Sequence, residues 1–394
     1  MRALRLLALF VPSAALVAAC VLEGFNRVEG GPMDGGTGLP TDGAAGTDGG
    51  GGGQVACVSA GPPDAPDAAE AGGSAKFVLA VRKVLVIEQS DGGVLGVDVD
   101  RMCTCHGEGS SCKPALGAGD ASVCDDPEGR DNALQGLFGI IQLAMPDKDL
   151  SELYSERADA GEWSVLMRVS GYNAQENDSE VQVTSYVTTG LNPHGLGPYP
   201  LWDGTDKWPI SAACLDAGPD GAPSTDYPLY TTDFAYVSDR MLVASLPKSE
   251  MVFAGTVARI GLVITGGLVM GRLSPSPTGW RLTDGIIAGR VAIKDLFRAI
   301  SGYRDEDGNA LCMSSPFYDS VRNSLCKAVD TLEDLGGSPS QPCDSLSMAI
   351  GFEAQSAMLG TIMPPPDGGA GCTPDADPIN DSCLLVPADA GGDG

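Results

Sequence analysis

Apolar and polar residues alternate along a series of segments between residues 76 and 290, and this period of two constrains the fold more than any other feature. In residues 162–173, Val165, Met167 and Val169 fall on one face, as they would in a strand with one buried side. Runs rich in glycine and aspartate separate such segments, which is typical of the turns in β-hairpins. The pattern predicts a fold made mainly of antiparallel strands.

The period changes towards that of a helix in residues 132–145, 292–301 and 316–335. Another apolar segment, residues 346–362, fits a helix or a strand. Strands and helices occupy separate parts of the chain, which favours an α+β fold, mainly antiparallel β and sandwich-like, with helical additions. We expect a single folded domain over residues 76–365, stapled by disulfides.

Both flanks of this domain are low in sequence complexity. Residues 20–75 consist mainly of Gly, Ala, Asp, Pro and Thr, and residues 366–394 return to Pro, Gly and Asp. Such segments bury too little apolar surface to compensate for the entropy lost on ordering. We therefore expect a flexible tether before the domain and a disordered acidic tail after it.

Residues 1–19 have the parts of a secretory signal peptide. Arg2 and Arg5 precede an apolar run, residues 6–19, which is shorter than the roughly 20 residues that a membrane span needs. The start of the chain therefore predicts export.

A cysteine ends this signal. Residues 16–20 (LVAAC) resemble the bacterial lipobox, in which the cysteine is acylated and becomes the first residue of the mature chain. The alternative is an ordinary signal with a chance cysteine. We expect lipid attachment, with palmitate among the acyl chains, at Cys20. Because Val21 and not aspartate follows, we expect an outer-membrane lipoprotein that faces the periplasm or the cell surface.

Export makes disulfides the expected state of the cysteines. Besides Cys20 and Cys57, the latter in the tether, ten remain, and their spacing favours pairing within 103–124, within 312–343, and between the last two. Zinc is less favoured, because a C-x-C spacing with His106 makes a poor zinc set. The disulfide candidates are Cys103, Cys105, Cys112, Cys124, Cys214, Cys312, Cys326, Cys343, Cys372 and Cys383.

The chain is strongly acidic, with 24 Lys and Arg against 52 Asp and Glu and a formal net charge of −28. Such a surface repels nucleic acid and anionic lipid, so we expect no nucleic-acid partner and regard cations as natural small ligands. The alternative is that the acidity serves solubility alone.

An acidic turn follows Cys124. Carboxylate and amide oxygens on a tight loop are the ligands that a hard cation such as calcium prefers. The alternative is a turn whose Asp or Asn caps the following helix. The candidate calcium ligands are Asp125, Asp126, Glu128, Asp131 and Asn132.

Residues 190–229 are a long irregular segment that contains Trp202 and Trp208. Loops of this length are often functional, and aromatic rings beside acidic residues are typical of sugar-binding loops. We therefore name Trp202 and Trp208 as candidate ligand-binding residues. The alternative is that the two rings pack the segment onto the core.

The sequence carries no complete catalytic motif. Its two histidines, His106 and His194, lie outside any G-x-S-x-G or H-E-x-x-H pattern, so we name no catalytic residue. Paired carboxylates of the glycosidase type stay open as an alternative. We expect a non-catalytic binding or envelope-associated structural module with an unidentified envelope or extracellular ligand. The alternatives are an exported carbohydrate-active hydrolase and a calcium-dependent carbohydrate-binding module.

Several segments of the expected domain, among them GRDNAL and WRLTDGIIAGR, resemble large families of uncharacterised glycine- and aspartate-rich lipoproteins of some Gram-negative bacteria. The resemblance covers most of residues 76–365. It implies a membrane-anchored lipoprotein and no established activity. The segments are 124–134, 171–183, 235–247, 280–290 and 343–347.

Overall fold

The computed structural model describes residues 59–67, 71–86, 95–106, 108–114, 120–144, 149–193, 195–254, 259–304, 309–365 and 371–383. The predicted signal peptide, Cys20, Cys57 and His194 lie outside these residues. Where the predicted tether is described, it contacts the fold. The N–H of Ala60 donates to the carbonyl oxygen of Glu128 at 2.7 Å, and the hydroxyl of Tyr236 donates to the carbonyl oxygen of Pro63.

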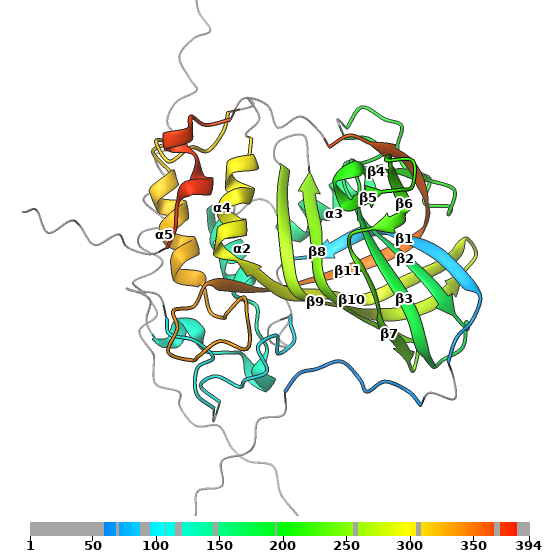
Figure 1. Ribbon diagram of the computed structural model, residues 1–394, viewed down its shortest axis with the longest axis horizontal. Coiled ribbons are helices and arrows are strands. Elements are labelled where there is room, and N and C mark those ends of the chain that lie inside the picture. The colour runs from blue at the N-terminus through cyan, green and yellow to red at the C-terminus, as the bar shows by residue number, and fades with distance from the viewer. Residues whose placement is uncertain are drawn as a thin grey trace, which may run out of the picture. The chain divides into compact units, whose positions relative to one another are not determined.

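Eight antiparallel strands close into a barrel (Figure 1). Each strand pairs with the next, and β1 also pairs with β11, with Val78 opposite Ala357, which closes the sheet. The prediction of mainly antiparallel β with a few helices is confirmed, and closure takes the place of the expected sandwich-like arrangement. In order around the barrel the strands are β1 (Ala75–Leu85), β2 (Val165–Tyr172), β3 (Asp178–Val187), β7 (Thr231–Ser238), β8 (Met241–Ala254), β9 (Arg259–Ser276), β10 (Gly279–Ala292) and β11 (Ser345–Met363).

Aliphatic and aromatic side chains fill the barrel. All eight strands contribute to one core cluster, in which the alternating residues Val165, Met167 and Val169 of β2 are buried as predicted. Leu166, between two of them, belongs to a separate cluster on the outer face. The interior of an eight-stranded barrel is just wide enough for side chains to fill it, so the period of two in the sequence follows from this packing.

Helices pack against the barrel. By contact, α3 lies against β1, α2 against β11 and α5, and α4 against β9 and β10. The three predicted helical segments are confirmed, although the last ends at Ala328, and residues 346–362 form a strand because β10 and β1 pair with them on both sides. Within the described part of the chain, every helix is too short or too polar to cross a membrane. The bounds are α2 (Ala133–Ala144), α3 (Leu150–Asp159), α4 (Ile293–Gly302) and α5 (Tyr318–Ala328).

Short elements cover part of the outer face. β4 (Lys207–Ser211) pairs parallel with the end of β11, and β5 (Leu215–Ala217) pairs with β6 (Pro223–Pro228). Beneath them lies the second apolar cluster, which includes Trp208 and Ile210. The 3-10 turns of the chain are η2 (Asp120–Val123), η3 (Pro127–Gly129), η4 (Ala212–Cys214), η5 (Pro374–Ala376) and η6 (Pro378–Asn380).

Disulfides join distant parts of the fold. The described pairs are Cys105–Cys124, Cys112–Cys343, Cys312–Cys372 and Cys326–Cys383, and Cys103 is also disulfide-bonded. The first pair confirms the expectation of bonding within residues 103–124, whereas the second crosses from that cluster to residues 312–343.

The other predicted pairings, within residues 312–343 and between the last two cysteines, are wrong because chain proximity does not decide which cysteines meet. Cys372 does not pair with Cys383, because the fold brings each of them within 5.3–5.5 Å, Cα to Cα, of a cysteine in the α5 region. Cys343 likewise meets Cys112 and not a neighbour in its own cluster. Cys214, predicted as a disulfide candidate, is a buried free thiol in the outer-face cluster.

Residues 371–383 are ordered, which corrects the expectation of disorder throughout residues 366–394. Besides two disulfides, the carboxylate of Asp381 accepts hydrogen bonds from Tyr318 Oη at 2.8 Å and Arg322 Nε at 2.9 Å. These contacts bind the segment to α5, so the folded part continues past residue 365.

Candidate cation site

Carboxylates from two segments meet beside the barrel. Ligand oxygens of Asp98, Asp100 and Asp131 lie within 4.8 Å of one another. The side chain of Asp125 is hydrogen-bonded to Asp131 and is close enough to the other two for their charges to act on it. We call these four residues the acidic cluster.

Backbone pairing positions the acidic cluster. Val97 and Asp131 form an antiparallel bridge, with the N–H of Asp131 donating to the carbonyl oxygen of Val97 at 3.1 Å. The carboxylate of Asp131 in turn accepts from the N–H groups of Val99 at 2.8 Å and Asp100 at 3.3 Å. The cluster is therefore built into the backbone and does not depend on long, mobile side chains.

Turns hold the other carboxylates. Asp98 Oδ1 accepts from the N–H groups of Arg101 at 2.5 Å and Met102 at 3.1 Å, so its side chain closes a tight turn. Asp125 Oδ2 accepts from the N–H of Thr104 at 2.6 Å, and these two residues directly flank the Cys105–Cys124 disulfide. The disulfide therefore fixes Asp125 near the cluster.

Burial makes the negative charges costly. Asp100 and Asp131 are 7% and 4% exposed. Burial raises the pKa of Asp131 well above its usual range, and the charges of Asp100, Asp125 and Asp330 raise it further. Burial also raises the pKa of Asp125 and of Asp100. At neutral pH the cluster is thus stable with bound protons or with a cation among its oxygens.

One buried guanidinium faces the cluster. The positive charge of Arg290 interacts with Asp100 and Asp131, but its hydrogen bonds go to carbonyl oxygens, from Nη1 to Val99 at 2.8 Å and from Nη2 to Glu333 at 3.4 Å. Among the described residues Arg290 is the one buried arginine, and it leaves most of the negative charge of the ionised cluster without compensation. Hard divalent cations bind such sets of oxygens, so the residues present fit Ca²⁺.

The structure brings together part of the predicted calcium set. Asp125 and Asp131 belong to the acidic cluster. Asp126 lies next to it but contributes no carboxylate to the group of closest oxygens. Glu128 points to solvent and forms an ion pair with Arg130 at 2.6 Å.

Asn132 serves the fold and not the cluster. Its Nδ2 donates to the carbonyl oxygens of Leu95 at 2.8 Å and Ala349 at 3.0 Å, and its Oδ1 accepts from the N–H of Ala349 at 2.9 Å. Oδ1 also accepts from the N–H of Gln135 at 3.3 Å, in the first turn of α2. The capping alternative therefore describes Asn132, because its amide is fully used in joining α2 to β11.

Asp98 and Asp100 are the members that the sequence interpretation missed. The signal was present in Val97-Asp98-Val99-Asp100, where a spacing of two places both carboxylates on one side of an extended segment. That spacing becomes informative once Asp131 is known to pair with this segment.

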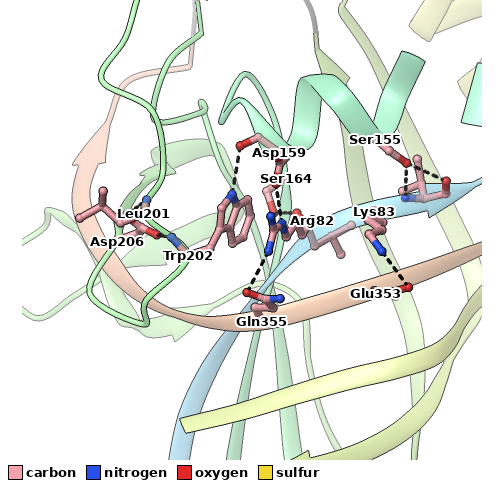
Figure 2. Close-up of polar contacts among 12 residues, drawn as sticks. Arg82, Lys83, Ser155, Asp159, Ser164, Leu201, Trp202, Asp206, Glu353 and Gln355 are labelled. Carbon is pink, nitrogen blue, oxygen red and sulfur yellow. Dashed lines mark hydrogen bonds and ion pairs between the residues drawn. The ribbon is translucent and has the colours of Figure 1, made fainter. Parts of the chain in front are cut away.

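The tryptophans of the long loop pack into the outer-face cluster. Trp208 is 0% exposed, and its ring centroid lies 5.6 Å from that of Trp202, which is 9% exposed. Trp202 Nε1 donates to the carbonyl oxygen of Asp159 at 3.0 Å (Figure 2). Trp208 therefore cannot stack on a ligand and packs onto the core, whereas Trp202 keeps a small exposed part that lines a surface cleft.

The geometry of the acidic cluster also bears on the catalytic alternative. Glycosidases place two carboxylates on opposite sides of a substrate bond, about 5–10 Å apart and open to a saccharide. Asp100 and Asp131 are buried, with oxygens closer together than that spacing allows.

No protein-family model, curated protein or solved structure matches the chain.

Proposed function

We propose that this protein is an exported, lipid-anchored module of the cell envelope that is not an enzyme and that binds calcium as a structural ion. The observation that carries the calcium part is the convergence of Asp98, Asp100 and Asp131, with oxygens within 4.8 Å, beside the buried guanidinium of Arg290. The signal-like start and the lipobox-like residues 16–20 support export and anchoring.

Calcium would act by joining two chain segments. Asp98 and Asp100 belong to the segment before the cysteine loop, whereas Asp125 and Asp131 follow it. A cation shared by both groups neutralises their repulsion and closes the loop against the barrel. This is the structural use of a metal, in which binding free energy becomes folding free energy.

The carbohydrate-active hydrolase has less support. The acidic cluster is buried, and apolar side chains occupy the barrel interior, so neither presents an open cleft with opposed carboxylates. A binding or structural role agrees better with this packing.

Thermal unfolding of the full mature chain, with calcium or with EDTA, tests the proposed ion. A ligand at about 100 times its Kd stabilises a protein by about 2.7 kcal/mol, which raises the melting temperature by several degrees. Asp126→Asn serves as the matched control, since Asp126 lies beside the cluster, and should keep the shift. An equal melting temperature in calcium and EDTA would refute the calcium role.

Mass spectrometry of the mature N-terminus tests the anchor separately. We expect cleavage before Cys20 and an acylated cysteine. An unmodified Cys20, or cleavage at another residue, would remove the lipoprotein part of the proposal and leave the calcium part intact.

A further inference from the structure

A cleft of about 600 Å³ opens on the outer surface of the protein, between β1, α3 and the loop before β4. Its size is in the range of small-molecule and oligosaccharide sites. It is separate from the acidic cluster. The residues that line it include Arg82, Glu156, Asp159, Tyr199, Leu201 and Trp202.

Trp202 forms a fixed base for the cleft. Figure 2 shows its indole nitrogen directed at Asp159 and the guanidinium of Arg82 beside its ring. The Arg82 guanidinium carbon lies 5.3 Å from the ring centroid. The same ring packs on Trp208, so Arg82 lies over an aromatic surface that is itself anchored to the outer-face cluster.

Tyr199 stands at the rim with its side chain 62% exposed. Several hydrogen bonds hold its loop: the Asp206 carboxylate accepts from the N–H groups of Leu201 at 2.9 Å and Trp202 at 2.7 Å, and Asn192 Oδ1 accepts from the N–H of Gly197 at 2.6 Å. The Leu201 and Trp202 contacts to Asp206 appear in Figure 2. An exposed ring on a loop that is already ordered loses little entropy on binding a ligand.

The polar groups of the cleft are close together and accessible. Arg82 Nε donates to Asp159 Oδ1 at 2.5 Å, and Arg82 Nη1 lies 3.4 Å from Gln355 Oε1. Glu156 is exposed, and its carboxylate has no hydrogen bond or ion pair to the described residues. One guanidinium and two carboxylates give this cleft a formal charge of −1.

This chemistry selects among ligand classes. The net negative charge disfavours phosphates, acidic sugars and nucleic acid, and the exposed carboxylates disfavour an acyl chain. A neutral sugar has hydroxyls that both donate and accept, together with C–H faces that pack on an aromatic ring.

We propose that this cleft binds a neutral oligosaccharide. The ring of Tyr199 packs on one sugar face, while Arg82, Asp159 and Glu156 hydrogen-bond its hydroxyls. This site goes beyond the proposed structural ion and depends neither on that ion nor on the lipid anchor.

Calorimetric titration of the full mature protein with cellohexaose, xylohexaose, maltohexaose, mannohexaose and chitohexaose, each to about 10 mM, tests the site. We expect at least one to bind, with Tyr199→Ala weakening that binding by about tenfold or more and Tyr199→Trp retaining it. Tyr227→Ala, which removes an exposed tyrosine outside the cleft, is the matched control and should leave affinity unchanged.

Thermal melting of each variant shows whether it is folded. Binding by none of the five sugars, or equal affinity in folded Tyr199→Ala, would overturn the proposal. Binding of hexalysine in place of every sugar would also overturn it and would identify the cleft as a site for basic peptides.

Discussion

The carboxylate of Asp131 accepts a 2.8 Å hydrogen bond from the backbone N–H of Val99, although 32 positions separate the two residues. This contact places Asp131 against the segment that carries Asp98 and Asp100. The hydrogen bond and the antiparallel bridge at Val97 together hold three carboxylates near one another before any ion binds. The acidic cluster is therefore preorganised for a cation.

Raising the pH should destabilise the protein in EDTA. Burial raises the folded-state pKa of Asp131 and raises that of Asp330 to about 7, whereas an unfolded aspartate titrates near 3.8. Between those values the folded state holds protons that the unfolded chain has released, so stability is present at low pH and is lost as the pH rises. We expect a higher melting temperature at about pH 5 than at about pH 8.

Calcium should reduce this pH dependence, because the cation stabilises the ionised carboxylates. Thermal unfolding at both pH values, in EDTA and in calcium, measures the change in melting temperature. A metal-free protein whose melting temperature rises steadily from about pH 5 to about pH 8 would contradict the raised pKa values of the buried aspartates.

Replacing Asp131 with Asn should separate charge from hydrogen bonding. Asn retains an oxygen that can accept from Val99, but it removes a buried negative charge. In EDTA we expect Asp131→Asn to be more stable than the unsubstituted protein, by about 1 kcal/mol, as measured by urea unfolding. The same variant should lose its response to calcium.

Asp126→Asn is the control for that experiment, since it removes one negative charge beside the cluster without removing a member. Loss of the calcium response in both variants would show that the nearby charge matters and the proposed ligand set does not.

The Cys112–Cys343 disulfide should contribute more stability than Cys105–Cys124. The first closes a separation of 231 residues and the second a separation of 19. In the chain-entropy account, loops of these lengths differ by about 2 kcal/mol in their effect on the unfolded state. Paired Cys→Ala variants, compared by urea unfolding, measure the difference. A smaller loss of unfolding free energy on removal of Cys112–Cys343 than on removal of Cys105–Cys124 would contradict the chain-entropy explanation.

Trp208→Ala should destabilise the protein by about 3–5 kcal/mol, because the ring is wholly buried and its removal leaves a cavity in the outer-face cluster. Tyr199→Ala, in the same long loop but exposed, should cost under about 0.5 kcal/mol. Equal losses in the two variants would mean that the loop does not pack as described.

Local patterns predicted the strands and missed how they close. Val165, Met167 and Val169 show their buried face within five residues, so the period of two is enough. Closure depends on Val78 meeting Ala357, and no local period reports a pairing between the two ends of the domain. A sandwich and a closed barrel therefore present the same alternation.

The sequence predicted only part of the acidic cluster, because local patterns do not report which distant segments pair. The acidic turn was visible because Asp125 and Asp131 are near in sequence. Asp98 and Asp100 join them through the bridge from Val97 to Asp131, which only the fold provides. Glu128 looked equivalent to its neighbours in the sequence, but its backbone conformation and its ion pair with Arg130 direct it to solvent.

Calorimetric titration of the metal-free, full mature protein with Ca²⁺ at neutral pH, repeated with Asp98→Asn and with Asp126→Asn, tests directly whether the acidic cluster binds calcium. We expect saturable binding that Asp98→Asn abolishes or weakens by at least about tenfold and that Asp126→Asn leaves unchanged. Absence of binding at millimolar calcium, or equal affinity in folded Asp98→Asn, would contradict this expectation.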